Sequence, residues 1–522
     1  MPSPKKRQWL PESIRPGSPH GSAHGLSRGL SAAQQVSLSF VGLIAVGMLG
    51  FRLVPGLAVG APLGWLDALF MATSAVCVTG LSILDVSRDL SFWGQLWLLG
   101  LIQAGALGIL TLAGLVLSLA GRRMGLEAEE AARGPGSALG PGAARRILRA
   151  AVLFTFAIEA VGAGLLWLLW HDAGVGAVAG AGAVGAVGAG AVGGAGGAAA
   201  AAADGAGGLF GSGTDPGPGQ LVWIAVFHSV SAFCNAGFSL FSDSLVGFQT
   251  RPALLSTLAA LIVVGGLGFP VIVDLQEQLQ GRLRGKRPRI RLHTRLVLGA
   301  TAFVLVGSTG LYLVCEWSGT LSELGLLDRL VNALFMAVTA RTAGFNTVDY
   351  DALSNAGIFL TVALMWIGGA PASVAGGVKI TTVALLALLL ISRLRGTEHT
   401  SLAGRTVPKE TVQRAAGLAA GAVFLMAALL LVLLMLEPAG LSGAPGDRLQ
   451  LVRLVFELQS AFSTVGLSMG PTTAELTPGA RLLMVATMLL GRLGPLVVLA
   501  AMADRLRERV DFRHAHEDVL VG

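Results

Sequence analysis

Four short segments of the chain share one glycine-centred pattern. Three of them begin with Ser-Ala six residues before the glycine, and all four place Leu or Phe directly after it. The segments read Ser74-Ala-Val-Cys-Val-Thr-Gly80-Leu, Ser231-Ala-Phe-Cys-Asn-Ala-Gly237-Phe, Val338-Thr-Ala-Arg-Thr-Ala-Gly344-Phe and Ser460-Ala-Phe-Ser-Thr-Val-Gly466-Leu. A pattern that recurs in this way indicates one structural unit used four times.

The chemistry that suits such loops is the binding of a dehydrated cation. A cation that leaves water needs oxygen ligands, and four loops around one axis can supply rings of backbone carbonyl groups. Carbonyl groups point inward only where the backbone takes unusual dihedral angles, which glycine adopts at low cost. We therefore predict a filter formed by Val78, Thr79, Gly80, Asn235, Ala236, Gly237, Thr342, Ala343, Gly344, Thr464, Val465 and Gly466.

The pattern also has a simpler interpretation. Small residues at this spacing pack membrane helices together without forming any site. For one loop alone the two interpretations compete. Four loops at equivalent positions in the chain favour the filter.

The elements that must position these loops are apolar. Of the 522 residues, 53% are hydrophobic and only 13% are charged, which is about half the charged fraction of a soluble chain. Eight apolar runs are each long enough to cross a bilayer as a helix of about 20 residues. They are Val36–Val54, Trp93–Ala120, Ile147–Trp170, Ala253–Val273, Leu296–Cys315, Gly357–Ile391, Thr411–Leu436 and Leu482–Met502.

Four shorter apolar segments, at about 62–84, 220–242, 328–348 and 449–470, lie between paired runs. Each fits a half-helix followed by an extended loop, which membrane depth tolerates only where the backbone is buried or lines water. The C-terminal end of each half-helix would direct its partial negative charge at the ion. The predicted fold is an all-α membrane protein with eight transmembrane helices in four pseudo-symmetric helix–pore loop–helix repeats around a central pore.

Basic residues are distributed unevenly between the two sides. Of the 37 Lys and Arg residues, 27 fall in alternate connections if the N-terminus is inside. This positive-inside bias predicts a multi-pass protein of the cell membrane with both termini cytoplasmic. The net charge of +7 then faces lipid headgroups or a cytosolic partner, and no nucleic acid is expected.

These observations divide the chain into pore repeats and tails. An Ala/Gly-rich segment, 173–214, is predicted to be an external linker, because glycine costs about 1 kcal/mol per residue in a helix. The predicted units are a cytoplasmic basic tail 1–35, repeats 36–120, 147–275, 295–392 and 409–503, and a cytoplasmic tail 504–522.

On these motifs the chain resembles the Trk/Ktr/HKT superfamily of potassium transporters, over about residues 36–505. The carrying stretches are Thr73–Ser82, Ser231–Phe238, Thr339–Asn346 and Phe456–Ser468. Eight spans with no extra pair ahead of the first repeat are most similar to the KtrB-type subunit. The resemblance implies a potassium ion in the pore, a homodimer with one pore per protomer, and a cytosolic ring of nucleotide-binding regulatory subunits supplied by a separate chain. Glycine at position 80 is the potassium-type residue of the family.

The sixth apolar run is interrupted by Gly368-Gly-Ala-Pro-Ala-Ser-Val-Ala-Gly-Gly377-Val-Lys379. Four glycines and a proline cannot continue a helix smoothly. The stretch 368–378 resembles the family's intramembrane gating loop, although Ala370, Ala372 and Val374 replace its usual small polar or glycine residues. A packing kink is the alternative. The resemblance assigns the gate to Gly368, Gly369, Ala370, Pro371, Ala372, Ser373, Gly376, Gly377, Lys379 and Arg492.

Three cationic residues lie within the apolar stretches. A charge at the bilayer centre costs about 2.5–3.5 kcal/mol on insertion scales, so Lys379 and Arg492 should have partners or line water. The alternative is that both side chains extend to the interface. Arg341 lies three residues before Gly344, and we expect it to support the filter by pairing with Glu457.

The functional prediction is channel-like potassium uptake, and the alternative is sodium- or proton-coupled potassium symport. Symport would need a further site, and no unpaired carboxylate is evident within the spans; sodium is retained as a candidate regulator. A membrane-embedded enzyme or lipid-binding scaffold would need a polar cluster in mid-span. None is evident, so neither enzymatic activity, nor a cofactor in this chain, nor a metal beyond potassium is expected.

Overall fold

The computed structural model describes residues 32–108, 143–173, 217–285, 290–397, 399–402, 405–437, 448–470 and 472–494. In this part the chain is helical apart from loops and one hairpin, formed by β1 (Ser401–Leu402) and β2 (Arg405–Thr406). Several predicted parts lie outside the described residues: the tails, nearly all of the linker 173–214, and the C-terminal parts of the predicted spans Trp93–Ala120 and Leu482–Met502.

Four short helices lead into the four glycine loops. Each buries a phenylalanine completely, ten residues before its glycine in three cases (Phe70, Phe227 and Phe456) and nine residues before it in the third helix (Phe335). The helices are α2 (Trp65–Val76), α9 (Pro218–Phe233), α13 (Leu326–Thr339) and α17 (Arg448–Ser463). These rings anchor each short helix by its apolar face, so that its C-terminal end and loop are held inside the bundle.

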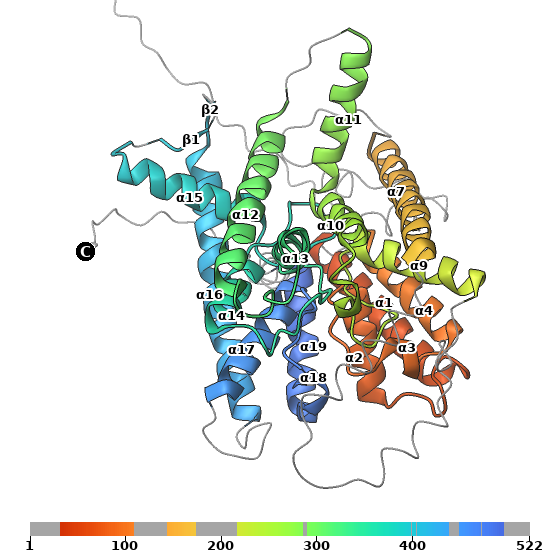
Figure 1. The fold of residues 1–522 in the computed structure, drawn as a ribbon. Coiled ribbons are helices and arrows are strands. Elements are labelled where there is room, and N and C mark those ends of the chain that lie inside the picture. The colour runs from red at the N-terminus through yellow and green to blue at the C-terminus, as the bar shows by residue number, and fades with distance from the viewer. Residues whose placement is uncertain are drawn as a thin grey trace, which may run out of the picture.

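Each short helix lies between a preceding and a following helix. The preceding helices are α1 (Ala32–Leu53), α7 (Ala143–Ala173), α12 (Leu292–Glu316) and α16 (Lys409–Leu436). The following helices are α4 (Phe92–Ala106), α10 (Pro252–Gly266), α14 (Asn355–Met365) and α19 (Pro478–Leu493). Each preceding helix packs against its own short helix, and Figure 1 shows α7 on one side of the bundle and α12 and α16 on the other.

Several of these helices are long and apolar enough to cross a membrane. In the described part they are Ala151–His171, Leu292–Glu316 and Lys409–Leu436, and a bent pair of helices adds a fourth candidate. Their outward faces carry exposed apolar side chains such as Phe303, Val314 and Phe424. Such surfaces are unfavourable in water and suit lipid.

The predicted span Ala253–Val273 is broken in the structure. Helix α10 ends at Gly266, and α11 (Phe269–Leu283) continues from it at an angle of 101°. The break follows from Gly265-Gly-Leu-Gly268, because Gly268 takes φ = 80°, a conformation that a side chain disfavours. Pro270 in the first turn of α11 then favours a new helix start over continuation.

The sixth apolar run is likewise divided, into α14 and α15 (Ile380–Leu394), with an extended segment between them. Figure 1 shows α11 and α15 reaching away from the bundle, while α2 and the short helices α3 (Val86–Asp89) and α18 (Thr472–Glu475) lie at its other end. At that end, Arg481 of α19 pairs with Asp67 of α2 at 3.0 Å. This ion pair connects the last helix of the described chain to the first short helix.

Candidate ion-conduction site

The four glycine loops share one backbone conformation. Their glycines have φ of 90°, 71°, 80° and 91°, in chain order. The residue two positions before each glycine also has positive φ, although none of these is glycine: Val78, Asn235, Thr342 and Thr464 have φ of 55°, 56°, 79° and 50°. Each loop thus has two residues with left-handed backbone conformation, separated by one residue with negative φ. This alternation changes the direction of successive peptide groups along the loop. Backbone strain of this kind persists only where the surroundings enforce it, and it concentrates at functional sites.

The glycines close into a ring. A methyl group added at Gly80 would meet the carbonyl oxygen of Ala236, and one added at Gly237 would lie 2.7 Å from the carbonyl oxygen of Ala343. A methyl group added at Gly344 would meet the carbonyl oxygen of Val465. One added at Gly466 would meet the carbonyl oxygen of Thr79, in the first loop. The structure therefore brings all four predicted filter loops together, in the order in which they occur along the chain.

Each loop is tied to its own short helix. The amide nitrogens of Thr79, Ala236 and Val465 donate to the carbonyl oxygens of Ser74, Ser231 and Ser460, at 2.8, 2.7 and 2.8 Å. In the third loop the amide of Ala343 donates instead to Thr339, at 3.0 Å. The Gly344 amide donates to the same carbonyl oxygen at 3.5 Å. The acceptor in the third loop therefore lies one residue nearer its glycine, as the buried phenylalanine does.

The predicted gate segment lies against the fourth filter loop. An added methyl group at Gly376 would meet Thr464 Oγ1, and one at Gly377 would lie 3.3 Å from Cβ of Ser463. The two ends of the segment run side by side, because the Gly368 amide donates to the Val378 carbonyl at 2.9 Å and the Ile380 amide donates to the Gly369 carbonyl at 3.0 Å.

The same segment is bound to the break between α10 and α11. The amide of Ala370 donates to the carbonyl oxygen of Gly266 at 3.0 Å, and the amide of Phe269 donates to that of Ala372 at 3.1 Å. Gly268 fits closely here, since an added methyl group would lie 2.6 Å from the carbonyl oxygen of Pro371. The bend of 101° thus provides backbone partners for an irregular segment at membrane depth.

Cationic side chains satisfy further carbonyl groups of this segment. Arg492 donates to the carbonyl oxygen of Val374 and, at 2.8 Å, to that of Gly105 in α4. Lys379 Nζ donates to the carbonyl oxygen of Ala375 at 2.6 Å. These contacts point both side chains at the protein interior, which disfavours extension to the interface.

The expected pair of Arg341 and Glu457 is not formed. Arg341 donates instead to the carbonyl oxygens of Ile367 and Gly368, at 3.4 and 3.3 Å. Glu457 accepts from the Met469 amide at 3.2 Å and from the hydroxyl groups of Ser468 and Thr473. Each residue therefore binds other partners. Arg341 connects the third loop to the predicted gate segment, and Glu457 orders the chain beyond the fourth loop.

A second glycine repeat packs against the loops, and the sequence analysis did not predict it. Gly105, Gly265 and Gly491, from α4, α10 and α19, each press against the carbonyl oxygen four residues before a filter glycine, in Val76, Phe233 and Phe462. No added methyl group fits at any of the three. The signal was present as Gly105-Ala-Leu-Gly108, Gly265-Gly-Leu-Gly268 and Gly491-Arg-Leu-Gly494.

A small cavity of about 20 Å³ lies between the predicted filter loops and the predicted gate segment. Its lining includes Asn235, Arg341 and Gly369, which come from the second loop, the third loop and the gate segment. Its volume is about that of one ordered water molecule.

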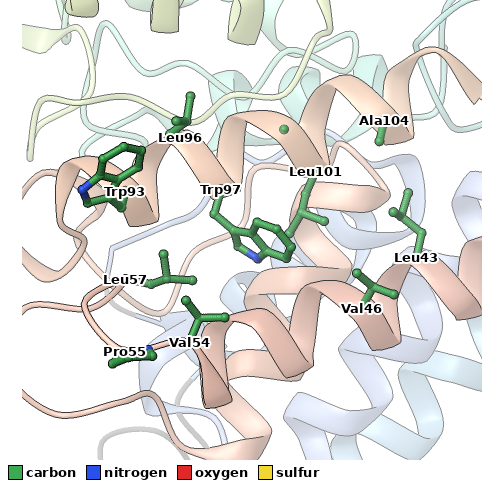
Figure 2. A pocket seen from close by; sticks show the side chains of 11 residues that line it. Leu43, Val46, Val54, Pro55, Leu57, Trp93, Leu96, Trp97, Leu101 and Ala104 are labelled. Carbon is green, nitrogen blue, oxygen red and sulfur yellow. The ribbon is translucent and has the colours of Figure 1, made fainter.

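A second cavity lies away from the loops. This cavity of about 550 Å³ lies between α1 and α4, and its lining is apolar and includes Trp93, Trp97 and Leu43 (Figure 2). None of the predicted filter or gate residues lines it, so it is not a part of the ion path.

The chain is similar to known proteins over most of its length. The family model described as "TrkH: Cation transport protein" matches residues 44–508. The chain is 30% identical over 497 residues to the Ktr system potassium uptake protein B of Bacillus subtilis. The alignment covers 94% of this chain and 96% of the relative. It is 32% identical over 495 residues to the potassium/sodium uptake protein NtpJ of Enterococcus hirae, covering 93% of this chain and 98% of the relative.

The fold is also that of a solved structure. The potassium transporter TrkH from Vibrio parahaemolyticus superposes with a TM-score of 0.66 at 17% sequence identity, over 92% of this chain and 87% of that one. At this identity the likeness establishes a shared fold. The family match covers most of the chain, and the family is one of transporters and not of enzymes. The chain therefore belongs to the TrkH family of cation transport proteins.

Proposed function

We propose that this protein takes up potassium across the cell membrane through a channel-like pore. The observation that carries the proposal is the closed ring of four loops, in which each glycine packs against the carbonyl group before the next glycine. Such a ring offers backbone oxygens around one axis and requires no acidic side chain. The pore would be formed by eight spans in four helix–pore loop–helix repeats, with both termini cytoplasmic.

Potassium as the transported ion is supported by the relatives. The B. subtilis relative is named a potassium uptake protein and the E. hirae relative a potassium/sodium uptake protein. Gly80, the potassium-type residue, lies within the ring. The membrane potential would drive inward flux, at about 2.3 kcal/mol per charge for each 100 mV.

The segment 368–378 is proposed as the gate. It contacts the fourth filter loop through Gly376 and Gly377 and is bound by Arg341 and Arg492. A homodimer in membrane lipid, bound to a cytosolic ring of nucleotide-binding subunits, would complete the transporter. The name "Ktr system" of the B. subtilis relative supports the view that the chain acts with other components.

Flux in proteoliposomes tests the proposal. Potassium and sodium gradients are applied separately to the purified protein, to a Gly80→Ser variant and to a variant lacking 370–375. Voltage-dependent potassium flux in the wild type, with a lower potassium-to-sodium selectivity in Gly80→Ser, would support the filter. Absence of flux in the variant without the gate segment would contradict the channel. Potassium flux that requires a proton or sodium gradient would instead support the symporter.

A further inference from the structure

A carboxyl group lies in the membrane-embedded part of α7, contrary to the expectation from the sequence. Glu159 is near the middle of the apolar stretch Ala151–His171, and only 4% of it is exposed. An ionised side chain at the bilayer centre costs about 2.5–3.5 kcal/mol on insertion scales. A carboxyl group kept at such a position needs a counter-ion or a proton.

The partners of Glu159 are neutral. Glu159 Oε2 accepts from Gln103 Nε2 of α4 at 3.1 Å. Glu159 Oε1 and Cys234 Sγ lie 3.6 Å apart, and Cys234 Sγ donates to Gln103 Oε1 at 3.3 Å. Among the residues whose side chains the structure describes, no lysine or arginine forms an ion pair with Glu159.

These three side chains have matched donors and acceptors only when Glu159 carries a proton. Gln103 donates to Glu159 Oε2, and the single thiol hydrogen of Cys234 lies within reach of both Glu159 Oε1 and Gln103 Oε1. A proton on Glu159 Oε1 would donate to Cys234 Sγ and leave the thiol hydrogen for Gln103 Oε1. Three donors and three acceptors close a cycle without net charge. After the proton leaves, the single thiol hydrogen cannot serve both Gln103 and Glu159, so the cycle opens and leaves a buried charge.

The surroundings offer few other groups that titrate. Helix α9 contributes Ser229, whose hydroxyl donates to the Glu159 carbonyl oxygen at 2.7 Å, and Cys234. Helix α10 brings Leu261 beside Gly162 of α7. Among these described neighbours only Cys234 is titratable. The charged groups that act on that cysteine are Glu159 itself and Arg492 of α19.

The cluster lies next to both filter and gate. Cys234 caps α9 and directly precedes the filter residues of the second loop. Gln103 lies in the last turn of α4, two residues before Gly105, whose carbonyl oxygen accepts from Arg492 at 2.8 Å. The other donor of that arginine holds Val374 in the gate segment. Arg492 and Glu159 both act electrostatically on Cys234, so the cluster and the cation that contacts the proposed gate share a neighbour.

We propose that Glu159 is an intramembrane proton-binding site, protonated in the arrangement seen here, and that loss of its proton draws Arg492 away from Val374 and favours an open gate. The link to opening rests on the gate proposed above, whereas the proton site does not. Potassium flux should then increase with pH.

Infrared spectroscopy of the protein in lipid bilayers tests the site without any need for flux. Wild type should show the carbonyl band of a protonated carboxylic acid, which Glu159→Gln removes and Cys234→Ser shifts. Ser229→Ala is the matched control, because it removes a contact to the Glu159 backbone and leaves both carboxyl oxygens with their partners; it should keep the band. The same spectrum in wild type and Glu159→Gln would overturn the proton site.

Flux across a pH series tests the link to the gate. Wild type and Ser229→Ala should conduct more as pH rises, and Glu159→Gln, which mimics the protonated form, should lose this increase. An unchanged pH dependence in Glu159→Gln would overturn the link while the infrared result stands. Absence of flux at every pH, even without residues 370–375, would contradict the conducting pore and leave the proton site to be judged by its band.

Discussion

Arg492 connects the gate segment to the bundle by donating to the carbonyl oxygen of Val374. Its second contact, to Gly105 at 2.8 Å, fixes the guanidinium group on α4, so the arginine holds two elements that are remote in sequence. Neither oxygen carries a formal charge. The interaction is therefore weaker than a buried ion pair, which would suit a contact that breaks when the proposed gate opens.

Replacing Arg492 with Gln should raise basal potassium flux. A hydrogen bond to a charged group contributes about 1.5–3 kcal/mol, and about 1.4 kcal/mol corresponds to a tenfold change in an equilibrium. Flux through a rarely open gate should thus increase by about tenfold or more, as measured in proteoliposomes. Arg481→Gln on the same helix is the control. Its partly exposed pair with Asp67 contributes at most about 1 kcal/mol, and its flux should match wild type.

Removing residues 370–375 should also raise flux and leave selectivity unchanged. The ends of the segment already lie together, since the Gly368 amide donates to the Val378 carbonyl at 2.9 Å and the Gly376 carbonyl lies against Gly368. The shortened chain can therefore close without disturbing α14 or α15. Potassium-to-sodium flux ratios compared with wild type provide the measurement. A shortened protein that conducts no faster than wild type would exclude this segment as the gate.

Gly80→Ser should weaken the discrimination between potassium and sodium. The new side chain would meet the Ala236 carbonyl group in a backbone with φ = 90°, so the ring must deform to admit it. Gly60→Ser is a matched control, because Gly60 has φ = 87° and no atom within 4 Å of an added methyl group. It carries the same dihedral strain without filter contact. Equal selectivity in both variants and wild type would remove Gly80 from the filter.

The sequence predicted that the four glycine loops meet because its signal is a repeat. Four glycines recur with the same neighbours, and the loops meet as expected, since glycine and the left-handed residue before it fix the local backbone. The Arg341–Glu457 pair was wrong for a different reason. Burial of both residues was predictable, but the choice of partner depends on which backbone carbonyl groups the irregular segment leaves unsatisfied.

Other features depended on contacts that spacing does not show. The bend after Gly266 has a signal in the sequence, Gly265-Gly-Leu-Gly268. The same motif begins near the ends of α4 and α19, so the three copies form a repeat. Glu159 carries no comparable signal. A single glutamate in an apolar run becomes informative only when Gln103 and Cys234, distant in the chain, are seen beside it.

The packing of the second glycine repeat yields the last prediction, Gly105→Ala compared with Gly100→Ala on the same helix. An added methyl group at position 105 would overlap the Val76 carbonyl group below the first filter loop, whereas at position 100 it meets nothing within 4 Å. Alanine stabilises a helix over glycine by up to about 1 kcal/mol, so Gly100→Ala should keep or raise the melting temperature in detergent. Gly105→Ala should lower it, because overpacking typically costs about 1–3 kcal/mol, and should also reduce potassium selectivity by displacing Val76. Equal melting temperatures for the two variants would show that α4 can move away from the filter at little cost, and the close approach of Gly105 would then not be what positions the first loop.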